Sequence, residues 1–397
     1  METFMKLKVL VVLLFFSRSA CLLNANAQPA SDVPSTVENN ILRKIEKTYN
    51  VKRGGTLTVV SEFGAIDVQT AEENKVETVI TFSPANWNNG SVVIQGDGNI
   101  VVKQGGDIRI NGNVVTVNGV RVKSDGTVQN ELGAKLDPKV QKAIEDFEVT
   151  FEHKGSDVRI NGKFKRGRKH WRKELNRLKI LFQVTVPQQY NVNLDTSSGG
   201  VSVADLDGDV RAKTSAGSLR LGRIKGPVWG RTSSGSVKLT SCDSAVDVKT
   251  SSGTVEVGDV AGDVRAQTSS GSIKIVRCDG NTEVQTSSGS IRLGSLARTV
   301  NARTSSGSIR ASLTDQPNGE CNLHTSAGSI TVTLIPDIAI NLDAETSAGR
   351  VSTDFAVTSV IQGKVPKNRL KGSINGGGPL LKLRTSAGSI RLQKAAD

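Results

Sequence analysis

The stretch TSSGSIRL, residues 286–293, combines a polar turn with a short strand-like segment, and near-copies of it recur through the second half of the chain. A Thr-Ser-Ser/Ala-Gly motif begins at ten positions, and the first seven of them follow one constant period: Thr196, Thr214, Thr232, Thr250, Thr268, Thr286, Thr304, Thr325, Thr346 and Thr385. A fixed short period predicts stacked units that bury their apolar faces only against each other.

Each 18-residue period divides into two halves of nine, and apolar residues alternate with polar ones in both halves. Val264, Ala266 and Thr268 face inward in one half, and Ile273 and Ile275 do so in the next. This two-residue period is typical of half-buried strands. We therefore predict an all-β fold: a right-handed, β-solenoid-like stack with about 18 residues per rung, plus a small α+β insert.

The Thr-Ser-Ser-Gly motif itself has two interpretations. In the favoured one it is a corner at which glycine allows the chain to reverse, with stacked hydroxyl ladders. The alternative is a threonine array that orders water or ice. The inward alternation of the threonines argues against the alternative.

Three segments resemble one bacterial family of exported β-strand-repeat proteins. They are GGTLTVVSEFGAIDVQT from Gly54, FQVTVPQQYNVNLDTSSGGVSV from Phe182, and GGGPLLKLRTSAGSIRLQK from Gly376. The chain is similar to domain-of-unknown-function family 4097, which is related to adhesin head domains, over residues 45–83 and 180–397. The resemblance implies an envelope-located binding or structural protein and carries over no catalytic residue.

The N-terminus has the features of an export signal. Lys6 and Lys8 precede the apolar run 9–16, and Ala25-Asn26-Ala27 is a typical cleavage site. We expect residues 1–27 to be a signal peptide cleaved after Ala27 and the protein to reach the periplasm or the cell surface. A lipoprotein that uses Cys21 is the less favoured alternative. The predicted organisation continues with an N-terminal β segment at 28–83, an insert at 84–179 and repeats at 180–397.

The insert shows hairpin and helix signals. Asn111-Gly112, Asn118-Gly119 and Asp125-Gly126 separate alternating runs, which favours tight hairpins. Asp137-Pro138 resembles a helix start, with Val140, Ile144 and Phe147 on one face. A second helix is predicted over Arg168–Leu181, with one apolar side and one basic side; these sides contain Trp171, Leu175 and Leu178, and Lys169, Arg172, Lys173 and Arg177.

Residues 152–179 contain eleven basic and three acidic residues, most of the net positive charge of the chain. A basic amphipathic helix binds anionic membrane surfaces, but the same pattern fits a helix packed on the stack with its charges in water.

The repeats predict a second basic feature. The outward position between the two buried residues of every second strand holds Arg220, Lys238, Glu256, Lys274, Arg292 and Arg310. Stacking would place these side chains ~4.8 Å apart. Such a column either holds a linear polyanion or is a solvated face that discourages edge aggregation.

The partners that the sequence predicts are anionic, because the chain has a formal net charge of +13. They are acidic polysaccharide, lipopolysaccharide or a membrane surface, with nucleic acid less favoured. End-to-end association through terminal rungs is a further expectation. Cys242, Cys278 and Cys321 are expected to be buried free thiols, since a two-rung separation exceeds disulfide geometry.

The sequence contains no recognisable catalytic constellation. His153, His170 and His324 are scattered, and no nucleophile elbow, phosphate-binding loop or Cys-x-x-Cys pair is present. We therefore expect no catalytic, cofactor or metal site, and a non-catalytic adhesin-like or scaffold binding module. The alternative is a polysaccharide-active β-solenoid enzyme, a lyase or a hydrolase, which would show a cleft lined by paired carboxylates.

Overall fold

The computed structural model describes residues 41–85, 137–359 and 366–395, together with six strands between residues 91 and 130. The chain forms two compact units. The larger comprises residues 44–81, 147–170 and 180–397, and the smaller includes residues 82–146 and 171–179. The predicted signal peptide lies outside the described residues.

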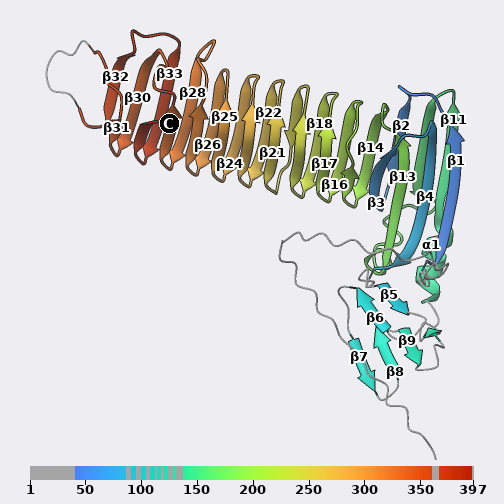
Figure 1. The fold of residues 1–397 in the computed structure, drawn as a ribbon. Coiled ribbons are helices and arrows are strands. Elements are labelled where there is room, and N and C mark those ends of the chain that lie inside the picture. The colour runs from blue at the N-terminus through green and yellow to red at the C-terminus, as the bar shows by residue number, and fades with distance from the viewer. Residues whose placement is uncertain are drawn as a thin grey trace, which may run out of the picture. The chain divides into compact units, whose positions relative to one another are not determined.

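The larger unit is built on two 14-stranded sheets, here called sheet A and sheet B (Figure 1). Sheet A has the order β1 (Arg43–Asn50), β4 (Lys75–Pro84), β13 (Leu178–Pro187), β3 (Ala65–Ala71), β15 (Val201–Val203), β17 (Leu219–Ile224), β19 (Val237–Cys242), β21 (Val255–Val260), β23 (Ile273–Cys278), β25 (Ile291–Leu296), β27 (Ile309–Leu313), β29 (Ile330–Leu334), β34 (Ile390–Lys394) and β31 (Val351–Thr353).

Sheet B has the order β11 (Phe147–Lys154), β12 (Asp157–Phe164), β2 (Thr56–Ser61), β14 (Asn191–Ser198), β16 (Val210–Ala216), β18 (Val228–Ser234), β20 (Val246–Lys249), β22 (Val264–Ser270), β24 (Thr282–Ser288), β26 (Val300–Ser306), β28 (Cys321–Ala327), β33 (Leu380–Ala387), β30 (Ile340–Ala348) and β32 (Arg369–Ile374).

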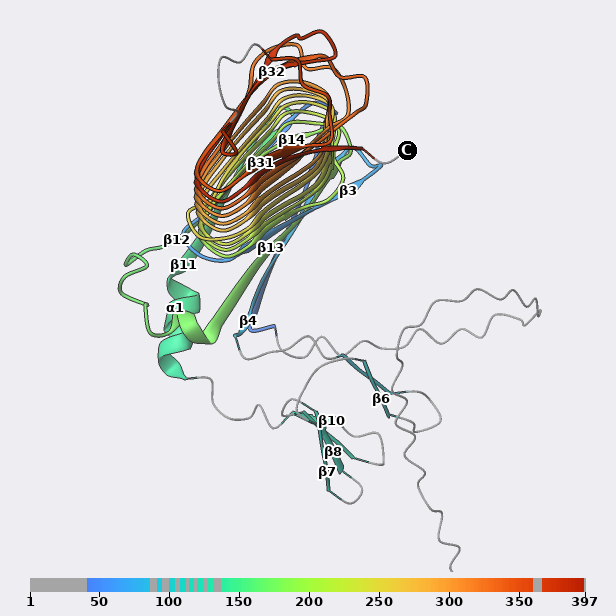
Figure 2. The ribbon, with the colours of Figure 1, turned by 90° about the vertical axis from the view of Figure 1, so that its left-hand side faces the viewer.

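One strand of each sheet makes a rung, and Figure 2 shows the rungs superimposed as flattened loops. Neighbouring rungs pair in parallel with an 18-residue register, as in Thr268 with Thr286 and Ile273 with Ile291. The inward residues of both sheets are buried; Val264, Ala266 and Ile275, for example, are at most 1% exposed. The predicted all-β repetitive stack is confirmed, and so is the length of its repeat.

The threonines of the repeated motif form a buried ladder. Each donates its hydroxyl to a glycine carbonyl of the neighbouring rung; Thr214 Oγ1 lies 2.9 Å from Gly199 O and Thr286 Oγ1 lies 2.9 Å from Gly271 O. All ten threonines are at most 6% exposed. The corner interpretation is thus confirmed, and the water-ordering or ice-ordering array is wrong, because the hydroxyls are used inside the protein.

The motif glycine is required by the same contact. Gly217 has φ +154°, and a Cβ placed there would overlap the carbonyl of Gly199 in the previous rung. Only a residue without a side chain lets successive corners approach so closely.

The stack departs from chain order at its far end. The rung β33–β34 lies between the rung β28–β29 and the rung β30–β31, although it follows both in sequence. Cys321 of β28 consequently pairs with Leu381. The antiparallel strand β32 covers β30, and at the other end of sheet B the antiparallel strand β11 covers β12.

The predicted hairpins of the insert are confirmed as strand pairs. β7 (Ile108–Asn111), β8 (Val114–Val117), β9 (Val120–Lys123) and β10 (Val128–Asn130) form an antiparallel sheet, and β5 (Ser91–Ile94) pairs with β6 (Ile100–Lys103). The predicted range 84–179 also contains β11 and β12, which are strands of sheet B.

The first predicted helix is present as α1 (Pro138–Asp146), with Val140 and Ile144 buried. The Asp137 carboxylate accepts the backbone N–H of Lys139 at 2.9 Å and caps it. Phe147, expected on the same face, is instead the first residue of β11.

The second predicted helix, Arg168–Leu181, is wrong. Residues 168–174 form turns, η2 (Leu175–Arg177) is a short 3-10 helix, and Leu178 already begins β13. From Leu178 onward alternate side chains are buried, because β13 pairs in parallel with β3. Trp171, Leu175 and Leu178 are buried as expected, but from turns and a strand.

Among the described residues, the predicted free thiols Cys242, Cys278 and Cys321 are buried and unpaired. Cys242 and Cys278 lie in one column of sheet A with Val260 between them, so one whole rung separates their side chains. Within the part of the chain described above, no helix has the length and apolarity needed to cross a membrane.

Candidate functional site: a cationic row and a groove

Sheet A carries the predicted cationic column as a continuous row. The strand register pairs Arg220 with Lys238, Lys274 with Arg292, and Arg292 with Arg310, with Glu256 between Lys238 and Lys274. Arg391 continues the row beyond Thr331, two rungs past Arg310. We call Arg220, Lys238, Lys274, Arg292 and Arg310 the cationic row.

All members of the cationic row are exposed. The described residues place no carboxylate in an ion pair with any of them. By contrast, Arg223 on the same sheet is paired with Asp205 at 2.7 Å, and Lys225 with Asp207 at 2.8 Å. Like charges at the ~4.8 Å spacing of strands repel one another unless an anion lies along them. The row is thus chemically suited to a linear anion.

The other predicted basic residues do not lie on one helical face, because the helix is absent. Lys169, Arg172 and Lys173 are exposed in the turns that precede η2. Arg177 is also exposed but is paired with Asp137 at 2.9 Å. An amphipathic helix is therefore no longer a reason to assign these four residues to a membrane surface.

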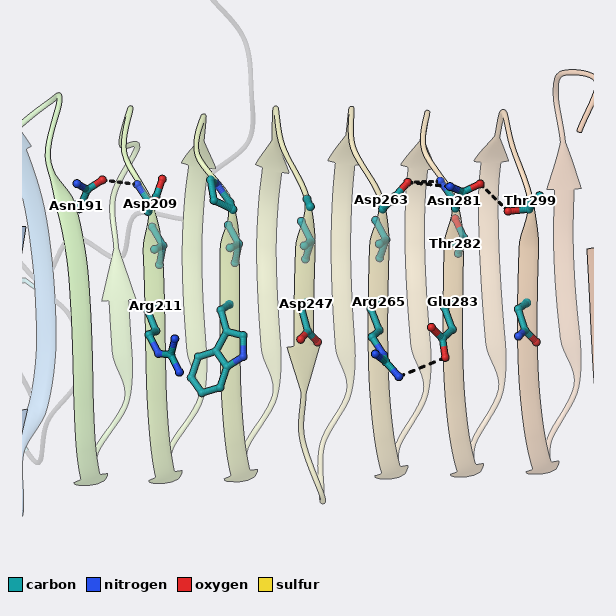
Figure 3. A pocket seen from close by; sticks show the side chains of 18 of the residues that line it. Asn191, Asp209, Arg211, Asp247, Asp263, Arg265, Asn281, Thr282, Glu283 and Thr299 are labelled. Carbon is teal, nitrogen blue, oxygen red and sulfur yellow. Dashed lines mark hydrogen bonds and ion pairs between the residues drawn. The ribbon is translucent and has the colours of Figure 1, made fainter. Parts of the chain in front are cut away.

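A groove of about 980 Å³ runs along the outer face of sheet B. Figure 3 shows an upper and a lower row of its side chains across successive strands, with shorter side chains such as Thr282 between the two rows. The upper row lies where each strand begins, and the lower row lies two residues further along each strand. The upper row contains Asn191, Asp209, Pro227, Ala245, Asp263, Asn281 and Thr299, and the lower row contains Asn193, Arg211, Trp229, Asp247, Arg265, Glu283 and Asn301.

The upper row is partly fixed by hydrogen bonds between rungs. Asn191 Oδ1 accepts the backbone N–H of Asp209 at 2.9 Å. Asp263 Oδ1 accepts the backbone N–H of Asn281 at 2.8 Å, and Asn281 Oδ1 accepts the hydroxyl of Thr299 at 2.6 Å (Figure 3). Pro227 and Ala245 interrupt this polar row and leave an apolar gap.

The lower row contains Trp229, which is half-buried. The guanidinium carbon of Arg211 lies 4.1 Å from the centre of the Trp229 ring, and that of Arg231 lies 4.6 Å from it. Arg231 is itself paired with Asp247 at 2.5 Å. These cation–π contacts and the ion pair hold the indole in place.

Three of the five groove carboxylates are already engaged by neighbouring residues. Asp247 is paired with Arg231, Glu283 with Arg265 at 3.5 Å, and Asp263 accepts hydrogen bonds from Asn281. Among the described residues, no three His, Cys, Asp or Glu side chains are grouped so that they could hold a metal ion. The arrangement is suited to binding by hydrogen bonds and ring contacts.

The groove was not predicted from the sequence. The signal for it is positional: Pro227 and Trp229 occupy outward positions that hold polar residues in most other rungs. An apolar substitution at an outward position of a repeat marks a surface feature, although it does not show which neighbours complete it.

The chain is thus a parallel β-repeat stack with a cationic row on one sheet and a groove on the other. The chain belongs to the Toastrack DUF4097 family, whose model matches residues 36–393. This confirms the resemblance found in the sequence.

The solved structures that are similar to the chain include two proteins described by their adhesion. One, a "putative cell adhesion protein" from Clostridium sporogenes ATCC 15579, is 11% identical with a TM-score of 0.19, covering 89% of this chain and 100% of that one. The other, a "putative adhesin" from Bacteroides fragilis NCTC 9343, is 11% identical with a TM-score of 0.30, covering 89% and 98%. No curated protein is similar to the chain.

Proposed function

We propose that this protein is a non-catalytic, adhesin-like binding module of the cell envelope that holds a linear anionic polymer along the cationic row. The observation that carries the proposal is the register of sheet A, which aligns Arg220, Lys238, Lys274, Arg292 and Arg310 in one file with Glu256 as the single acidic member between Lys238 and Arg310. Among the described residues, none of the five cations is in an ion pair. Export rests on the N-terminal signal features of the sequence. The polymer is an acidic polysaccharide, of which the glycan part of lipopolysaccharide is one source.

The row favours a polymer over a membrane surface for a geometric reason. The cations lie in a single file along the stack and project from one strand position. A flexible chain with regularly spaced acids can follow such a file, whereas a flat surface would also need apolar side chains beside it to insert. The largest exposed apolar side chain on sheet A is Val276, which stands alone among the described residues of that sheet.

The test compares two variants of equal net charge. In the first, Lys274, Arg292 and Arg310 are changed to serine; in the matched control, Lys213, Lys249 and Arg303, exposed on sheet B, are changed to serine. Binding to polygalacturonate, lipopolysaccharide and anionic vesicles is measured across a salt series. We expect salt-sensitive polygalacturonate binding that only the row variant loses.

Three outcomes would count against the proposal. Equal losses in both variants would show that net charge alone drives binding. Vesicle binding that survives the row variant and disappears when Lys169, Arg172, Lys173 and Arg177 are changed to serine would assign the function to the basic turns and a membrane. Cleavage of the polysaccharide during incubation would contradict the non-catalytic assignment.

A further inference from the structure

We propose that the groove on sheet B is a second binding site, for a linear, uncharged glycan whose sugar ring lies over Pro227, Trp229 and Ala245. This inference is independent of the cationic row, which lies on the other sheet. It rests on the composition and register of the groove walls.

The centre of the groove is an apolar platform. Pro227 and Trp229 lie two residues apart at the start of β18 and so point to the same face. Ala245 of the next rung is adjacent, because its carbonyl accepts the backbone N–H of Val228 at 2.9 Å. Pro227 and Ala245 are exposed and Trp229 is half-buried. Arg211 and Arg231 contact the Trp229 ring, so the part of the indole that they leave exposed, together with Pro227 and Ala245, would meet the C–H face of a pyranose.

The platform is surrounded by planar polar groups. Asp209 and Arg211 lie one rung before it, and Asp247 lies one rung after it, with Asp263 and Arg265 in the following rung. Carboxylate and guanidinium groups each offer two atoms to a pair of neighbouring sugar hydroxyls. The platform can therefore orient the sugar ring, and the polar side chains of the neighbouring rungs can bind its hydroxyl groups.

The groove is long enough for several sugars. Its lower row runs from Asn193 to Asn301 across seven rungs, each ~4.8 Å from the next. The geometry points to an oligosaccharide aligned with the stack.

The charge of the groove excludes the ligand assigned to the cationic row. Five carboxylates and two guanidinium groups line it: Asp209, Asp247, Asp263, Glu283 and Glu320 against Arg211 and Arg265. Arg231 neutralises Asp247, so the acidic excess is two charges. A polyanion is repelled by this excess, although the whole chain has a net charge of +13. A neutral glycan carries no such penalty and can use the oxygen atoms as hydrogen-bond acceptors.

The test titrates the full chain with cellohexaose, xylohexaose, mannohexaose and chitohexaose by calorimetry. We expect at least one hexasaccharide to bind, and its monosaccharide to bind at least about tenfold more weakly, since it contacts one rung or two. Trp229→Ala should weaken hexasaccharide binding by about tenfold. Ala245→Arg, an exposed substitution that fills the gap beside the ring, should do the same without changing the thermal unfolding temperature.

The row variant of Lys274, Arg292 and Arg310 is the matched control and should bind the hexasaccharide as the wild type does. Failure of all four hexasaccharides to bind would overturn the inference, as would binding that Trp229→Ala and Ala245→Arg leave unchanged. Binding of oligolysine in place of any glycan, lost in the same two variants, would reassign the groove to a cationic peptide. None of these results would affect the polyanion proposal.

Discussion

Replacing Thr286 by valine tests the buried hydroxyl ladder that joins the rungs. The hydroxyl of Thr286 donates to the carbonyl of Gly271 at 2.9 Å, and the threonine is 2% exposed. That carbonyl accepts no backbone N–H from the described residues. Valine keeps the branched shape but leaves the carbonyl unpaired, which costs about 1–3 kcal/mol. The additional buried methyl group offsets up to about 0.8 kcal/mol, so we expect a net destabilisation of about 1–2 kcal/mol.

The measurement has a global part and a local part. Urea unfolding followed by circular dichroism gives the change in the free energy of unfolding. Because the stability of a repeat array is a sum over rungs and their interfaces, hydrogen exchange of peptides from β24 and β25 shows whether the loss is local. Thr286→Ser keeps the donor and loses a methyl group, which separates packing from hydrogen bonding.

Ser287→Ala is the matched control, because Ser287 is the next residue and is exposed. It should change stability by less than about 0.5 kcal/mol. If Thr286→Val is as stable as Ser287→Ala, and exchange in β24 is unchanged, the hydroxyl ladder does not stabilise the stack and the reasoning is refuted.

Two further predictions concern ionisation. Burial and the nearby Asp157 carboxylate raise the pKa of Tyr190 to about 12. Absorbance titration of the folded Tyr49→Phe variant, in which Tyr190 is the only tyrosine, should therefore show no tyrosinate at about pH 10.5. Tyrosinate formation at that pH would contradict this. Burial also raises the pKa of Cys242, Cys278 and Cys321 above the ordinary thiol value of 9.0. At high pH the folded state then keeps thiol protons that the unfolded state releases. The thiol contribution to the free energy of unfolding should therefore be constant below about pH 8 and should fall as the pH rises above about 9. Urea unfolding across this range measures the decrease, which should be smaller in a triple Cys→Ala variant.

The stack was predictable because its sequence repeats the same local pattern at a fixed interval. Alternation identified the inward residues, and the constant spacing identified their partners, as with Thr268 and Thr286. The same information predicted the cationic row, since residues at equivalent positions of parallel strands become neighbours.

The segment after Gly167 was not predictable in the same way. Trp171, Leu175 and Leu178 have the three-to-four-residue spacing of a helix, but Leu178 is also the first residue of a two-residue alternation that ends at Val186. Pairing with β3, a strand from the far N-terminal part of the repeats, decided between the two. The two-residue alternation within one strand does not show which distant strand it pairs with.

The groove and the order of the last rungs could not be predicted from the sequence for a different reason. Outward residues are weakly constrained by packing, so Trp229 stands out only as an apolar residue at an outward position, and the alternation does not show which neighbours form a groove with it. After Thr304 the motif returns at Thr325, Thr346 and Thr385, out of step with the earlier period. Because the constant period ends there, the sequence no longer predicts which rung packs against which in the stack.

The displaced rung β33–β34 also affects how the stack can be completed. Most rungs pair with a neighbour one repeat away in sequence, but Cys321 pairs with Leu381, which is synthesised several repeat lengths later. By the loop-closure relation, pairing across this longer separation costs only about 1 kcal/mol more. The displaced order therefore affects when the last rungs can form more than how stable they are. The rung β30–β31 cannot take its place until the later segment has arrived beside β28–β29. A chain cut between residues 353 and 380 would therefore lose an internal layer, and the layers on either side of the break would have no partner in register.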